Sequence, residues 1–109
     1  MAYDEQLADE IRTVIGDHPG VSERDMFGGI AFLINGNMAV GVSGRELMVR
    51  VGKDHHDEAV ARPGARTFDM GSRPMRGWIG VAEEGFATEN DLQTWVRRGV
   101  AFAESLPAK

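Results

Sequence analysis

The chain contains no cysteine in its 109 residues, and this absence excludes several kinds of chemistry. Without thiols there is no disulfide framework, no thiolate nucleophile and no zinc site built from cysteine ligands. Long hydrophobic runs are also missing, since none approaches the roughly 20 residues that a membrane-spanning helix needs. The acidic N-terminus "MAYDEQLADE" argues against a secretory signal. We therefore expect a cytoplasmic protein without a membrane partner.

Basic residues are fewer than acidic residues in this chain. Lys and Arg number 12 against 17 Asp and Glu, which gives a formal net charge of −5. Nucleic-acid binding usually needs a basic surface that neutralises phosphates, so this balance argues against direct nucleic-acid binding and leaves only a local basic patch open. A hydrophobic fraction of 42% and a charged fraction of 27% are ordinary for a globular protein. The length predicts one domain over residues 1–109.

Two helices are predicted at the ends of the chain. The first begins at Asp4, a good N-cap residue, and ends at Gly16. The last begins at Thr88, which forms with Asp91 a sequence that resembles a capping box. Gly99 lies on the apolar face of this last helix, so we expect it to allow a close approach to a sheet.

The region between these helices is predicted to form mainly β-strands. Asn35-Gly36 is the strongest hairpin signal, because a type I′ turn needs positive φ at both central residues. A short helix capped by Asp54 is expected over residues 53–64. The predicted strands cover residues 21–26, 30–34, 38–42, 46–51, 67–70 and 77–82. The sequence therefore predicts an α+β fold: a two-layer domain in which an antiparallel sheet, a meander of about five to six strands, has its helices packed on one face.

The paired glycines Gly28-Gly29 raise the question of a phosphate-binding loop. They match neither the Walker spacing nor the dinucleotide fingerprint, and they open a strand where an anion site would need a helix N-terminus. Glycines at such a point more often supply positive φ or a bulge. We interpret them as backbone geometry.

The chain also resembles a known family. The motif "MFGG" (Met26, Phe27, Gly28, Gly29), the Asn35-Gly36 hairpin, "LMVRV", "RPMRGW" and a final helix ending in "SLPAK" are similar to the TfoX N-terminal domain family. The resemblance implies a compact α+β domain, often paired as a dimer, with no known active site. Full-length TfoX is a bacterial competence regulator that works with the cyclic-AMP receptor protein. It carries a second, helical domain, which would begin where this chain ends.

Candidates for catalysis or metal binding are weak. His55 and His56 are adjacent and point about 100° apart on a helix, so they do not converge on one metal ion. Only His55 and Glu58 share a face, which suits a polar helix start as well as a ligand pair. No serine, histidine and acid form a recognisable triad. We expect no enzyme activity, no metal and no cofactor.

The segment from Arg62 to Trp78 is the strongest candidate for an interaction surface. Its four arginines lie in an otherwise acidic chain, and Arg, Trp and Met are enriched at interface hot spots. The alternative is that the arginines form ion pairs within the domain and that Trp78 belongs to the core. The candidate surface comprises Arg62, Arg66, Arg73, Met75, Arg76 and Trp78, with Met48 and Arg50 of the neighbouring strand.

The sheet itself gives a second reason to expect association. If Leu47 and Val49 face the helices, Met48 and Arg50 face away from them. In the preceding hairpin the residues on both faces of the strands are apolar. The second face of the sheet is therefore more apolar than a solvated face usually is. This pattern predicts a homodimer or a partner-binding sheet.

Three functions follow from these observations. The leading hypothesis is a non-catalytic regulatory domain that acts through contacts with a protein partner, which the resemblance suggests is a transcription regulator. Direct nucleic-acid binding through the Arg62–Trp78 segment is the alternative. A small enzyme or metal-binding protein is the third, and it would need a pocket with converging groups.

Overall fold

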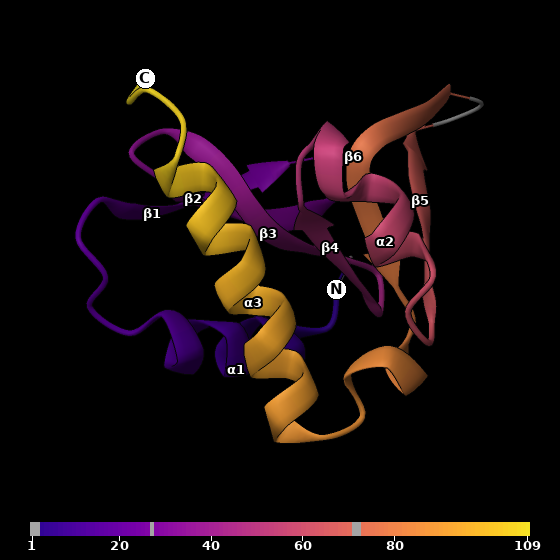
Figure 1. Cartoon of the computed structure of the whole chain (residues 1–109). Coiled ribbons are helices and arrows are strands. Elements are labelled where there is room, and N and C mark those ends of the chain that lie inside the picture. The colour runs from indigo at the N-terminus through magenta and orange to yellow at the C-terminus, as the bar shows by residue number, and fades with distance from the viewer. Residues whose placement is uncertain (1–2, 27, 71–72) are drawn as a thin grey trace.

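The structure is a computed structural model that describes residues 3–26, 28–70 and 73–109. These residues form a six-stranded antiparallel sheet and three α-helices, and α1 and α3 lie together against one side of the sheet (Figure 1). None of the helices in this part of the chain is long and apolar enough to cross a membrane. The elements are α1 (Glu5–Ile15), β1 (Val21–Met26), β2 (Gly29–Ile34), β3 (Asn37–Ser43), β4 (Glu46–Arg50), η1 (Lys53–His55), α2 (His56–Val60), β5 (Ala65–Met70), β6 (Arg73–Val81), η2 (Glu83–Phe86) and α3 (Glu89–Glu104).

The strand order is β1-β2-β3-β4-β6-β5, with every neighbouring pair antiparallel. The predicted meander runs through the first four strands, and the final hairpin then places β6 beside β4 and β5 at the edge. This order arises because the chain crosses from β4 through η1 and α2 to the outer edge before it returns. The α+β class, the antiparallel sheet and the helices on one face are confirmed.

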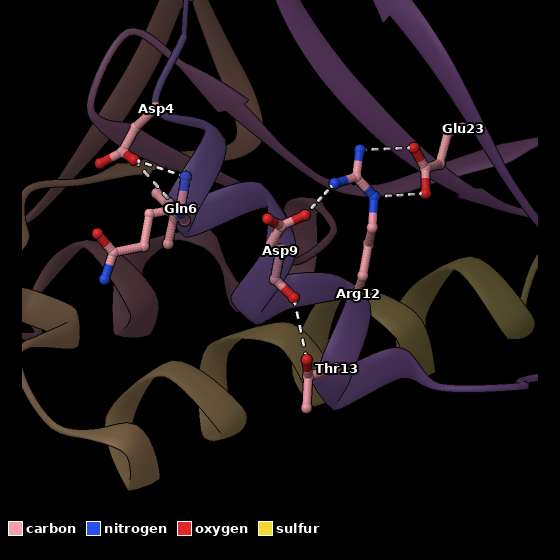
Figure 2. Close-up of polar contacts among 7 residues, drawn as sticks. Asp4, Gln6, Asp9, Arg12, Thr13 and Glu23 are labelled. Carbon is pink, nitrogen blue, oxygen red and sulfur yellow. Dashed lines mark hydrogen bonds and ion pairs between the residues drawn. The ribbon is translucent and has the colours of Figure 1, made fainter.

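The first helix begins and ends where its sequence predicts. Asp4 Oδ1 accepts hydrogen bonds from the N–H groups of Gln6 at 3.0 Å and Leu7 at 3.2 Å, and Gly16 closes the helix with φ of 59°. Figure 2 shows Arg12 of α1 reaching Glu23 of β1, with N–O distances of 2.8 and 2.9 Å. These hydrogen bonds hold the pKa of Glu23 below its usual range. The ion pair therefore fixes α1 to the edge of the sheet.

The glycine motifs serve backbone geometry, as predicted. Asn35 and Gly36 have φ of 53° and 83°, which a two-residue I′ hairpin requires. Gly28 has φ of 78°, and a Cβ at Gly29 would lie 2.1 Å from the carbonyl oxygen of Val42. Met26 ends β1, while Phe27 of the same motif lies outside the described residues.

Two local predictions are corrected by the structure. Asp54 does not cap a helix: it lies inside η1, and α2 begins only at His56 without a side-chain cap. The last strand begins at Arg73, four residues before the predicted start at Gly77. Pro74 falls in this extension, but β4 pairs with β6 only from Trp78 onward. Pro74 has no N–H to donate, but because it lies outside the β4–β6 pairing, the ladder between these strands loses no hydrogen bond.

The helix side of the sheet holds the hydrophobic core. Phe32, Val40 and Leu47 are buried there on three strands that contact α3. Gly99 lies directly over the sheet, because a Cβ at this position would be 2.4 Å from the carbonyl oxygen of Ala39. The predicted close approach of the last helix to the sheet is confirmed.

The second face of the sheet is apolar, as predicted, but it is closed within one chain. Leu33 and Met48 are only 5% and 8% exposed. Gly41 lies between the methyl groups of Met38 and Met48, which would be 3.1 and 2.7 Å from a Cβ on that glycine. Val21 is the one exposed large hydrophobic residue in the described part of the chain. Within the described residues this face therefore presents buried or half-buried apolar side chains, and the homodimer stays a prediction.

Candidate functional site

The structure brings together two residues of the predicted interaction surface, Arg50 and Trp78. They are direct partners in the pairing of β4 with β6. The Cζ atom of Arg50 lies 5.0 Å from the centroid of the Trp78 ring and 5.3 Å from that of Phe102 on α3. Both distances lie within the range of cation–π attraction. We call these three residues the Arg50 site.

The contact with Phe102 corrects the prediction that Arg50 points away from the helices. Arg50 is the last residue of β4, so its long side chain reaches the helix layer at the end of the sheet. Met48, two residues earlier, does lie on the second face, against Gly41. Strict alternation therefore holds inside the strand and fails at its end.

Arg50 is half-buried, and within the described residues it has neither an ion pair nor a side-chain hydrogen bond. Burial alone lowers its pKa, with no carboxylate opposing the effect. A guanidinium carries five N–H donors and no acceptor. The aromatic faces offset part of the desolvation, but they leave the N–H donors without acceptors. Arg50 thus presents unused hydrogen-bonding capacity at the surface.

Two glycines position the Arg50 site. Gly52 has φ of 86° and ψ of 156°, a region that is essentially restricted to glycine, and a Cβ there would be 2.4 Å from Cε1 of Phe102. The carbonyl oxygen of Gly77 accepts hydrogen bonds from the N–H groups of Val51 at 2.8 Å and Gly52 at 3.2 Å. The backbone that follows Arg50 is therefore bonded to the residue that precedes Trp78, and the Phe102 ring lies against Gly52.

An open hollow adjoins the Phe102 ring. Its lining combines apolar, basic and hydroxyl side chains. It is lined by Val51, His55, Arg98, Ala101, Phe102 and Ser105. Arg98 is already paired with Glu58, and the Ser105 hydroxyl donates to the carbonyl oxygen of Phe102 at 2.6 Å. The hollow can therefore take an apolar side chain, and its arginine is not free to bind an anion.

The adjacent histidines point to different places. His56 is buried, and its Nδ1 accepts a hydrogen bond from the Gly77 N–H at 2.8 Å. In the neutral ring Nε2 therefore carries the proton and donates to the Thr67 hydroxyl, 2.9 Å away. His55 lines the hollow. Among the residues that the structure describes, no group of three His, Asp or Glu could hold a metal ion.

The predicted arginine segment does not form one basic surface. Arg62 pairs with Glu58 and Arg76 with Asp57, both acids of α2, whereas Arg66 pairs with Glu46 of β4. This matches the alternative in which the arginines form ion pairs within the domain. Arg73 is exposed and Met75 is half-buried. The three pairs have N–O distances of 2.7 Å for Arg62, 2.7 Å for Arg66 and 3.1 Å for Arg76.

No feature of the last helix in the sequence linked Phe102 to Arg50. A signal was present in Gly52, a glycine directly after a strand, which often marks a close approach of another group. The identity of that group depends on how the helix crosses the sheet, and the spacing of apolar residues does not specify this crossing.

A comparison with protein families identifies the chain. The model of the family described as the TfoX N-terminal domain matches residues 14–103, which is most of the chain. The protein therefore belongs to the TfoX N-terminal domain family. No curated protein and no solved structure matches it significantly.

Proposed function

We propose that this member of the TfoX N-terminal domain family is a non-catalytic regulatory domain that binds a protein partner through the Arg50 site. One observation carries the proposal. Arg50 is a half-buried arginine on an aromatic platform, with no acidic partner among the described residues. Arginine and tryptophan lead the residue types that dominate protein interfaces, where a partner supplies the missing acceptors. The family resemblance suggests that the partner is a transcription regulator.

The charges favour a protein over a nucleic acid as the partner. The net charge is −5, and three arginines of the Arg62–Trp78 segment are already neutralised by acids of the same chain. A nucleic-acid surface needs several cations that are free to replace counterions along the phosphate backbone. A protein interface needs only a few well-placed anchors.

The test is a pull-down from a lysate of the source cells at two salt concentrations, with and without nuclease. The captured protein is then purified, and its affinity is measured against Arg50→Gln and Arg24→Gln. Arg24 is a matched control, because it lies on the distant strand β1 and forms no ion pair within the described residues. We expect one protein that survives nuclease, binds the control normally and binds Arg50→Gln weakly.

Two results would contradict the proposal. Nucleic acid retained at low salt and lost at high salt would make nucleic-acid binding the better function. A protein that binds wild type and Arg50→Gln equally would move the interface elsewhere. The homodimer is a separate proposal, and light scattering at high micromolar concentration tests it: a monomer would exclude it.

A further inference from the structure

We propose that the Arg50 site recognises a carboxylate in an acidic peptide segment of the partner, and that an apolar side chain beside that carboxylate occupies the hollow next to Phe102. This inference rests on the proposed function, because it assigns the chemistry of the partner at the same site. The geometry of Arg50 supplies the first half of the inference, and the wall of the hollow supplies the second.

Arg50 is arranged to bind a planar anion. The guanidinium lies within cation–π range of both the Trp78 and the Phe102 rings, and these two contacts favour one orientation of its planar fork. A guanidinium fork matches the two oxygens of a carboxylate and forms two parallel charge-assisted hydrogen bonds. Because the side chain is already ordered, little further conformational entropy is lost on binding.

The surroundings favour a single carboxylate over a phosphate or a polyanion. The nearest arginine on the rim of the hollow, Arg98, is held by Glu58 and is not available to a second anion. Asp54 lies on η1 directly before His55 and adds negative charge beside the hollow, whereas Asp57 on α2 is already paired with Arg76. A phosphate of higher charge would meet one unpaired guanidinium in an acidic domain. A carboxylate carries one negative charge, which this guanidinium balances.

The hollow favours a peptide over a free carboxylic acid. Val51, Ala101 and Phe102 supply the apolar part of the lining, and Phe102 also contacts Arg50, so the hollow and the Arg50 site share this ring. A side chain next to the bound carboxylate would cover this apolar lining and exclude water from the ion pair. Excluding water strengthens the charge-assisted hydrogen bonds, because the local dielectric falls. We therefore expect an Asp or Glu followed or preceded closely by an apolar residue.

The experiment begins with an unbiased selection. Random dodecapeptides displayed on phage are selected separately on wild type, Arg50→Gln and Arg24→Gln. We expect wild type and the Arg24→Gln control to enrich peptides with an acid beside an apolar residue. Synthetic copies of these peptides should lose about tenfold or more in affinity when the acid is replaced by its amide, or when Arg50→Gln is the target.

The two tryptophans locate the binding. Trp78 is half-buried in the Arg50 site, whereas the indole N–H of Trp95 is buried and donates to the carbonyl oxygen of Gly85 at 3.1 Å. In NMR titrations with a selected peptide, the Trp78 indole and the Arg50 Nε–H signals should move much further than the Trp95 indole. Arg50→Lys keeps the charge but loses the fork, so we expect it to bind about tenfold more weakly than wild type.

Each contrary outcome has a distinct meaning. Selected peptides without an acid, or equal binding of the acid and amide peptides, would overturn carboxylate recognition and leave a protein-binding function standing. A phosphoserine peptide that binds more tightly than its glutamate counterpart would also overturn it. If no peptide is enriched and a single-stranded oligonucleotide moves the Trp78 signal, both this inference and the proposed function are wrong. Unfolding of Arg50→Gln would be visible in its spectrum, and the amide peptide and Arg50→Lys then carry the test.

Discussion

Glu58 on α2 forms an ion pair with Arg98 on α3 and thereby ties the short helix to the long one. Glu58 also accepts a hydrogen bond from Arg62 at 2.7 Å. The two guanidinium carbons lie 5.7 Å (Arg98) and 6.0 Å (Arg62) from the centroid of the Trp95 ring. Hydrogen bonds from Arg98 and then Arg62 lower the pKa of Glu58 to about 2. The carboxylate is therefore a charged bridge between α2, which packs on β5 and β6, and α3, which packs on the middle of the sheet.

This bridge predicts an acid-dependent stability. The ordinary pKa of Glu58 is 4.5 and its pKa in the folded chain is about 2. As the pH falls, the unfolded chain therefore binds a proton at Glu58 before the folded chain does. The contribution to the free energy of unfolding is complete above pH 4.5 and is lost as the pH falls to about 2. Urea unfolding of wild type and Glu58→Gln should therefore differ at neutral pH and converge at about pH 2.

The control for this prediction is Glu10→Gln. Glu10 is exposed in the middle of α1 and forms no ion pair within the described residues, so its replacement should leave the acid side of the stability curve unchanged. Added salt should reduce the Glu58 effect, because the pair is exposed to solvent. A difference between wild type and Glu58→Gln that stays constant from neutral to acidic pH would contradict the assignment.

The N-cap of α1 gives a second prediction. Asp4→Ala leaves the N–H groups of Gln6 and Leu7 without their side-chain acceptor, and we expect a loss of about 1 kcal/mol in the free energy of unfolding. Asp4→Asn keeps an acceptor oxygen and should lose much less. Thermal or urea unfolding of the two variants checks this. Equal losses would show that the charge of Asp4 at the helix N-terminus matters more than the hydrogen bonds that Figure 2 shows.

Features set by neighbouring residues could be predicted from the sequence. The Asn35-Gly36 turn, the Thr88 cap and the boundaries of β1 follow from local rules about φ angles, helix ends and alternation. The apolar character of the second face was also readable. Its closure was not, because it depends on the flexible Met38 and Met48 side chains folding over Gly41.

The candidate site was only half predictable. Arg50 and Trp78 were both placed on the interaction surface, but their direct pairing depends on β6, and not β5, lying beside β4. The sequence offers no local signal for that choice. The arginines of the Arg62–Trp78 segment were grouped because they are close in sequence. Their separation follows from acids on α2 and β4 that are brought near them only by the fold.

The close packing of α3 on the sheet at Gly99 gives a third prediction. Gly99→Ala adds a Cβ that would lie 2.4 Å from the Ala39 carbonyl oxygen and 2.6 Å from Val40 Cγ1. Alanine improves helix propensity by about 1 kcal/mol, but overpacking against a backbone atom costs about 1–3 kcal/mol, so the packing loss should win. Urea unfolding should show a net loss of up to about 2 kcal/mol. Arg97→Ala on the same helix is exposed and should change little. A stabilised Gly99→Ala would show that α3 can move away from the sheet.

Gly52 connects the stability of the fold to the Arg50 site. Gly52→Ala must hold φ of 86° and ψ of 156°, and its Cβ would lie 2.4 Å from Cε1 of Phe102. We expect a loss of about 3 kcal/mol in the free energy of unfolding, from backbone strain and displacement of the ring together. Gly44→Ala is the matched control, since its φ is 60° and a Cβ there meets nothing within 4 Å. Its loss should be about 1 kcal/mol, from backbone strain alone.

The readout that separates strain from displacement is the environment of Trp78. Because Phe102 and Trp78 both contact the Arg50 guanidinium, moving the Phe102 ring should shift the Trp78 indole signal in the NMR spectrum of folded Gly52→Ala. Gly44→Ala should leave that signal in place, since Gly44 lies in the turn between β3 and β4, away from the site. A Gly52→Ala protein that is destabilised but keeps the wild-type Trp78 signal would show that Phe102 does not position Arg50, and the assignment of Phe102 to the site would then be wrong.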